Sequence, residues 1–169
     1  MPPIIKYTAT IAPNILKAGD KIKIKGIVLH DAYEFSINFV NELCKNPSDI
    51  TYHFKWKLDE NVIVENFKKN GEWIDHIETT YDELDGVLNN TGSHSSHTYT
   101  NTIINYSVLG SFFELEFAFQ DGIIDVYKIY DGGHNRITTY MTEIDISEIK
   151  ALQVWGDVQK IKELTFCYA

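Results

Sequence analysis

Length, composition and charge limit the classes of protein to which the chain can belong. The chain has 169 residues and a formal net charge of −9. This length predicts a single domain, residues 1–169, that is large enough to bury a hydrophobic core. The acidic balance argues against nucleic acids and anionic membranes as partners, because binding to either depends on clustered lysine and arginine.

The cysteines and the N-terminus indicate the compartment. Cys44 and Cys167 lie far apart and match neither a disulfide framework nor a zinc-binding spacing, so we expect two free thiols in a reducing compartment. The first ten residues, MPPIIKYTAT, contain no basic region followed by a long apolar run. We therefore expect a cytoplasmic protein with no signal peptide and no membrane insertion.

The first third of the chain alternates between polar and apolar residues, which is typical of strands with one wet face. Pro2, Pro3 and Pro13 disfavour a helix at the start of the chain. Strands are predicted at Lys21–Leu29 and Tyr33–Val40. In the second of these, the apolar face is predicted to hold Tyr33, Phe35, Ile37 and Phe39, and the polar face Glu34, Ser36 and Asn38.

The block from residue 51 to residue 78 predicts two further strands and the start of a third. Thr51–Leu58 alternates, Val62–Phe67 returns after a polar turn, and Lys68–Gly71 is predicted as a second turn that leads to Trp73. If the two strands pair, one surface carries His53, Lys55, Lys57 and Asn66, with the Trp73 ring at its edge.

Polar side chains beside a flat aromatic ring form the kind of surface that a sugar requires. Sugar hydroxyls must exchange water for matched donors and acceptors, and the apolar C–H face of a pyranose can cover an indole ring. The same alternation also fits an ordinary sheet with a polar outer face and one packed tryptophan. The residues alone leave both interpretations open.

The segment that follows is unlike the rest of the chain. Residues 88–102 are rich in Asn, Ser, Thr and His, so a loop insertion is predicted around residues 80–108. His94 and His97 lie in this segment without an acidic or cysteine partner at a fixed offset. We predict no metal site and no cofactor.

The C-terminal third again contains short apolar strands separated by glycine turns. They are predicted at Phe112–Phe119, Ile123–Tyr130, Ile137–Met141, Leu152–Trp155 and Val158–Tyr168, with one short helical turn within Asp145–Lys150. Many short strands and no long helical period predict an all-β protein, an antiparallel β-sandwich.

Three blocks in the middle of the chain resemble the carbohydrate-recognition segment of galectins. Residues 53–57 (HFKWK) resemble the family's His-x-Asn-x-Arg, residues 64–66 (VEN) its Val-x-Asn, and residues 73–78 (WIDHIE) its Trp-x-x-Glu-x-Arg. His53, Asn66 and Trp73 match this pattern. The similarity covers most of the chain outside residues 79–108, including the early strands at 17–39 and the closing strands at 144–166.

The resemblance implies a fold, a function and roles for three residues. The fold is a jelly-roll-like sandwich of five- and six-stranded sheets. The function is non-enzymatic binding of glycans or glycoproteins that carry β-galactosides or modified sugars. His53 would contact the axial hydroxyl of galactose, Asn66 the 6-hydroxyl, and Trp73 the apolar face of the ring. The resemblance also implies that the protein can reach the cell exterior without a signal peptide, and that a homodimer can form.

Four positions depart from the family pattern: Lys55, Lys57, His76 and Glu78 stand where galectins have Asn, Arg, Glu and Arg. Lys57 keeps a positive donor but lacks the planar fork of arginine, and His76 removes a carboxylate. These changes predict weakened or altered specificity, and the two lysines suit an acidic or sulfated sugar. The candidate sugar-binding residues are His53, Lys55, Lys57, Asn66, Trp73 and His76.

Two other classes of function are considered. A galectin-fold protein that has lost sugar binding would act through protein–protein contacts, and the four departures favour that alternative. A glycosidase would need two carboxylates across a cleft, and Glu65 and Glu78 are the nearest candidates. Neither residue belongs to a recognisable catalytic motif, so we do not expect an enzyme.

Overall fold

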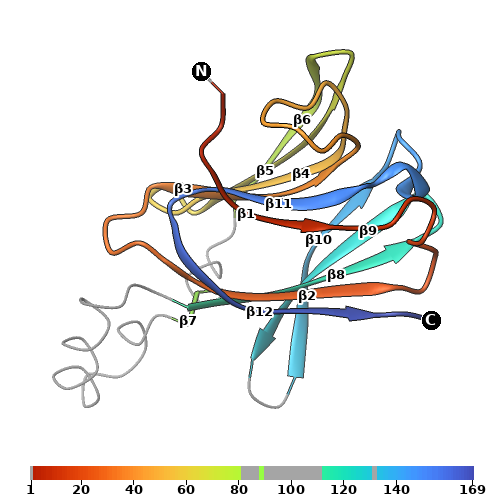
Figure 1. Ribbon diagram of the computed structural model, residues 1–169. Coiled ribbons are helices and arrows are strands. Elements are labelled where there is room, and N and C mark those ends of the chain that lie inside the picture. Colours follow the sequence, from red (N-terminus) through yellow and green to blue (C-terminus); the bar gives the residue numbers. More distant parts are fainter. Residues whose placement is uncertain (1, 81–87, 90–111, 131–132) are drawn as a thin grey trace, which may run out of the picture.

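The protein is a sandwich of two antiparallel sheets (Figure 1). The computed structural model describes residues 2–80, 88–89, 112–130 and 133–169. The first sheet consists, in spatial order, of β1 (Ile5–Thr10), β11 (Ala151–Gly156), β3 (Glu34–Val40), β4 (Ile50–Lys57), β5 (Val62–Lys69) and β6 (Glu72–Thr80). The second consists of β10 (Gly133–Met141), β9 (Ile123–Tyr130), β8 (Phe112–Gln120), β2 (Lys21–Val28) and β12 (Val158–Cys167), with β7 (Leu88–Asn89) beside β8.

The predicted all-β antiparallel sandwich is confirmed. A short 3-10 helix, η2 (Ile146–Glu148), lies within the predicted helical turn. No helix in the part of the chain that the structure describes has the length and apolarity needed to cross a membrane. The insertion predicted around residues 80–108, with His94 and His97, lies almost entirely outside the described residues.

Several strand boundaries differ from the predicted ones. β5 continues to Lys69, so the prediction that Lys68 lies in a turn is wrong. The turn is confined to Asn70 and Gly71, which both have positive φ angles of 52° and 82°. β10 begins at Gly133, before the predicted Ile137, because pairing with β9 holds a polar segment that has little strand propensity of its own.

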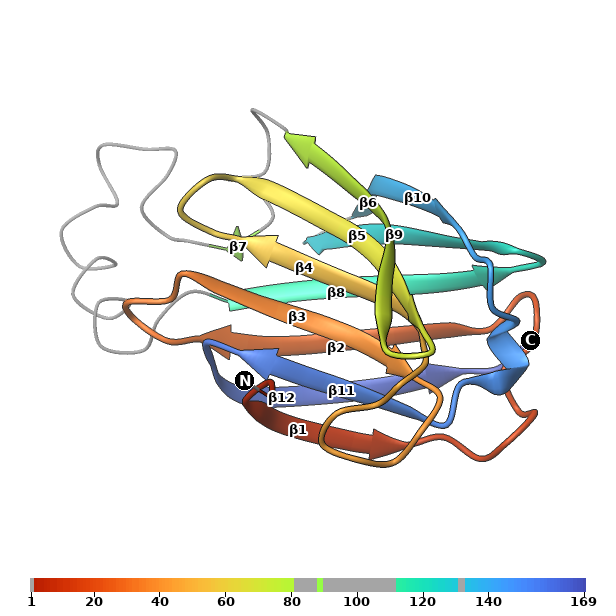
Figure 2. The same ribbon diagram turned by 90° about the horizontal axis from the view of Figure 1, so that it is seen from above.

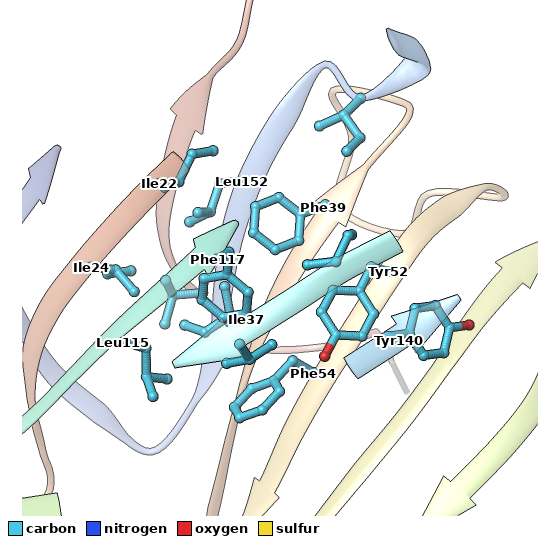
Figure 3. Packing of buried hydrophobic residues seen from close by; sticks show 14 of the residues in the cluster. Ile22, Ile24, Ile37, Phe39, Tyr52, Phe54, Leu115, Phe117, Tyr140 and Leu152 are labelled. Atoms are coloured by element: carbon cyan, nitrogen blue, oxygen red, sulfur yellow. The ribbon is translucent and has the colours of Figure 1, made fainter. Parts of the chain in front are cut away.

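The core between the sheets is rich in aromatic side chains (Figure 3). The Phe117 ring lies 5.1 Å from that of Phe39 and 5.6 Å from that of Phe54, measured between centroids. Tyr52 stacks on Tyr140 across the sandwich at 4.6 Å. Alternation in β3 and β4 sends these apolar side chains inward, so the polar residues of the same strands face outward on a firmly packed sheet.

A buried carboxylate links the two sheets. Glu65 is only 2% exposed, on the core side of β5, and it accepts hydrogen bonds from the hydroxyls of Tyr52 and, at 3.0 Å, Thr138. Burial raises the pKa of Glu65 above its ordinary value of 4.5. One of the two carboxylates considered for a glycosidase therefore lies in the core, on the opposite face from Asn66.

Substitution of Glu65 by glutamine is expected to change how stability depends on pH. A carboxyl whose pKa is raised by folding contributes stability that is fully present below its unfolded pKa and lost as the pH rises through its folded pKa. Urea denaturation at pH 4 to 8 should therefore show Glu65→Gln gaining stability relative to wild type with rising pH. Parallel pH profiles would contradict this expectation. Glu65→Ala leaves two hydroxyls without their acceptor and should cost about 2–5 kcal/mol.

Candidate functional site

A groove of about 690 Å³ lies on the outer face of the first sheet, the face seen in Figure 2. It crosses β6, β5, β4, β3 and β11 and reaches the segment before β1. Its lining is a mixture of polar, charged and aromatic side chains. The lining residues are Pro3, Ile4, Glu34, Phe35, Ser36, Asn46, His53, Lys55, Val64, Asn66, Lys68, Trp73, His76, Trp155, Gly156 and Asp157.

Five of the six candidate sugar-binding residues line this groove: His53, Lys55, Asn66, Trp73 and His76. His53 and Asn66 are direct partners in the β4–β5 ladder, which places them side by side. Lys57 does not belong to the lining. It lies at the end of β4, and its ammonium group is 3.6 Å from the carboxylate of Glu60 in the following turn.

A β-bulge explains how Trp73 and His76 reach the same face. The two residues are three positions apart, and a regular strand would direct them to opposite sides. The pairing of β5 with β6 shifts register at this point, and Asp75 has a φ of 56°. Burial, and to a smaller extent the negative charge of Asp75, raises the pKa of Tyr140 in the other sheet.

Hydrogen bonding determines the tautomer of His53. The amide nitrogen of Asn38 donates to Ser36 Oγ at 2.9 Å and to the Gln153 carbonyl at 3.2 Å, so its oxygen must be the atom that faces His53 Nδ1. Nδ1 therefore donates its proton to Asn38, and Nε2 is left as an acceptor. Burial, with a smaller contribution from Lys55, lowers the pKa of His53 to about 3, so the ring is neutral at physiological pH.

Two tryptophans flank the His53 ring. The ring centroid of Trp73 lies 4.7 Å from it and that of Trp155 lies 5.7 Å from it. Trp155 is 8% exposed and donates its indole N–H to Gln153 Oε1 at 2.9 Å, whereas Trp73 is 45% exposed. The ammonium group of Lys68 lies 5.4 Å from the Trp73 ring centroid. Trp73 is thus held by two neighbours and still presents a large apolar surface.

Asn66 contributes a polar atom that requires a partner. The residue is 7% exposed, and its side-chain oxygen is buried and accepts no hydrogen bond from any of the residues that the structure describes. Leaving such an atom unpaired costs about 1–3 kcal/mol.

The cationic groups near the groove already have polar partners. Lys55 Nζ is 3.0 Å from Glu34 Oε1, and Lys68 Nζ donates to Asn46 Oδ1 at 3.0 Å. His76 lies 2.9 Å from Glu78, and that hydrogen bond lowers the pKa of the Glu78 carboxyl. Because Lys55 and Lys57 are each paired with a carboxylate, their positions weaken the expectation of an acidic or sulfated sugar.

Several residues of the groove were not among the candidates: Ser36, Asn38, Asn46, Lys68 and Trp155 form the groove or support it. The polar face predicted for 33–40 already contained Ser36 and Asn38. The sequence pattern predicts a turn at Lys68, whereas the residue belongs to β5. Trp155 lies on a closing strand whose place beside β3 depends on long-range pairing, which the local pattern does not specify.

No group of three or more potential metal ligands occurs among the described residues.

An outward groove on a β-sandwich, with a neutral imidazole acceptor, an amide side chain and a half-exposed indole, is typical of a carbohydrate-binding lectin. The family model for galactoside-binding lectins matches residues 6–166. The chain belongs to this family, the galectins, which are non-enzymatic carbohydrate-binding proteins.

Solved structures of other galectins share the fold. The chain is similar to sheep galectin-11 in its complex with glycerol, with 18% identity, a TM-score of 0.66 and 98% of each chain covered. It is also similar to the Caenorhabditis elegans galectin LEC-6, with 16% identity, a TM-score of 0.65, and 99% of this chain and 94% of that chain covered. A comparison with curated protein sequences finds no match.

Proposed function

We propose that the protein is a working lectin that binds β-galactoside-type glycans in the groove. The observation that carries this proposal is the state of His53, which is neutral and tautomerically fixed, with Nε2 as an acceptor next to Asn66 and Trp73. A fixed acceptor suits a hydroxyl donor, because the ligand then bears no cost of orienting the imidazole.

The three matched residues would divide the recognition of one galactose unit between them. The axial hydroxyl would donate to His53 Nε2, and the 6-hydroxyl would contact the part of the Asn66 side chain that lines the groove. The apolar face of the sugar would lie on the Trp73 ring, which brings apolar area at low entropic cost. These contacts use hydrogen bonds and packing and involve no bond breaking.

Isothermal titration with lactose, followed by a glycan array, tests the proposal. We expect saturable binding of one lactose per chain, since His53, Asn66 and Trp73 line the same groove. Absence of heat with lactose and of signal on the array would contradict the proposal and favour the alternative of protein–protein contacts. The homodimer and the exit to the cell exterior expected from the resemblance remain predictions.

A further inference from the structure

An ion pair crosses the part of the groove next to the proposed galactose position. Lys55 Nζ lies 3.0 Å from Glu34 Oε1, and both residues line the groove. They belong to neighbouring strands, and Lys55 reaches diagonally, because its direct partner in the β3–β4 ladder is Ser36. The two side chains are 29% and 47% exposed, so a ligand in the groove can reach both charged groups.

The backbone of Glu34 is held firmly in place by the turn between β11 and β12. The amides of Tyr33 and Glu34 donate to Asp157 Oδ2 at 2.8 and 3.2 Å, and the amide of Asp157 donates to the Glu34 carbonyl at 2.9 Å. Gly156 has a φ of 92°, and a Cβ atom at that position would lie 2.7 Å from the same carbonyl oxygen. Glycine is therefore required at position 156. The side chain of Glu34 thus extends from a backbone that is held in a defined position.

Glu34 is the carboxylate of the groove that a ligand can meet. The groove lining contains one other carboxylate, that of Asp157, whose Oδ2 atom already accepts two backbone N–H groups. The carboxylate of Glu34 has the Lys55 ammonium as its charged partner, and neither group is fully buried. The pair therefore offers one donor and one acceptor about a hydrogen-bond length apart.

We propose that Glu34 is a specificity-determining residue that makes the groove select neutral glycans and reject anionic ones. This inference rests on the proposed lectin function. A neutral sugar with adjacent hydroxyls satisfies both members of the pair, donating to Glu34 and accepting from Lys55. A sulfate or carboxylate at the same place gains Lys55 but is repelled by Glu34, which is the kind of unfavourable element by which a site discriminates.

Titration calorimetry with lactose and with lactose sulfated on its galactose tests the inference. We expect wild type to prefer lactose by at least about tenfold, and Glu34→Gln to reduce this preference by at least about tenfold, because each tenfold step corresponds to about 1.4 kcal/mol. Glu60→Gln is the matched control, since it removes the same charge from Glu60, the carboxylate that pairs with Lys57 outside the groove. This control should leave the preference unchanged.

Lys55→Gln is a second, independent variant. It leaves Glu34 without its cation, so sulfated lactose should lose more affinity, relative to lactose, than it does in wild type. If wild type binds lactose but Glu34→Gln keeps the wild-type preference, the inference is wrong and the lectin function stands. If neither wild type nor the Glu34 variant binds either sugar, the lectin function itself is wrong, and the inference falls with it.

Discussion

Replacement of Trp73 by alanine is expected to weaken lactose binding by about thirtyfold or more, which corresponds to about 2 kcal/mol. The ring is 45% exposed at the groove and has His53 and Lys68 as neighbours. A held aromatic surface covers the sugar without a further loss of side-chain freedom, and alanine supplies neither the area nor the flat shape. Titration calorimetry with lactose measures the loss.

A matched control separates loss of the site from loss of the fold. Ile77 lies on the same strand, is 48% exposed and does not line the groove, so Ile77→Ala should bind lactose like wild type. Both variants should change the free energy of unfolding by no more than about 1 kcal/mol, as is usual for half-exposed side chains. Retained lactose binding by Trp73→Ala would remove Trp73 from the site.

His53 is expected to make the protein labile in acid. Burial lowers its pKa from 6.5 to about 3, so the unfolded chain takes up a proton at a higher pH than the folded protein does. The stability that depends on neutral His53 is complete above pH 6.5 and is lost as the pH falls towards 3. Between pH 7 and pH 3 the loss from this residue is about 4 kcal/mol, at about 1.36 kcal/mol per pH unit.

Urea denaturation of wild type and His53→Gln at several pH values isolates this contribution, since carboxylates that titrate in the same range are common to both proteins. The glutamine side chain can still donate to Asn38 Oδ1 but does not ionise. The variant should therefore gain stability relative to wild type as the pH falls below 6. A constant difference between the two proteins across that range would show that His53 is not the acid-sensitive group.

Much of the fold follows from alternation in the chain. Alternate apolar residues in 21–29, 33–40 and 51–58 predicted the strands and most of the faces they bury, because side chains on a strand point to opposite sides in turn. The prediction that Tyr33 belongs to the buried face is wrong, because the residue precedes β3 and is 68% exposed. That rule also grouped His53 and Lys55 with Asn66 on one outer surface, where the structure places them.

The remaining features of the groove depend on irregular and long-range strand pairing, which the alternation of residues cannot predict. A bulge at Asp75 brings His76 to the face of Trp73, and bulges are irregularities in pairing, which depends on the partner strand. Alternation also predicts Lys57 at the sugar-binding surface, but its ammonium group pairs with the carboxylate of Glu60 outside the groove. Trp155 joins the groove through the pairing of β11 with β3, far away in sequence.

The bulge in β6 also affects the tendency of the protein to self-associate through the edge of its sheet. Within the described residues β6 is an outermost strand of nine residues, and a long outer strand offers a row of free backbone N–H and C=O groups to another chain. Asp75, whose backbone is in the left-handed conformation, interrupts that row of hydrogen-bonding groups near its middle. The irregularity that shapes the groove therefore also limits edge-to-edge aggregation beside it, which helps a glycan-binding surface to remain accessible in concentrated solution.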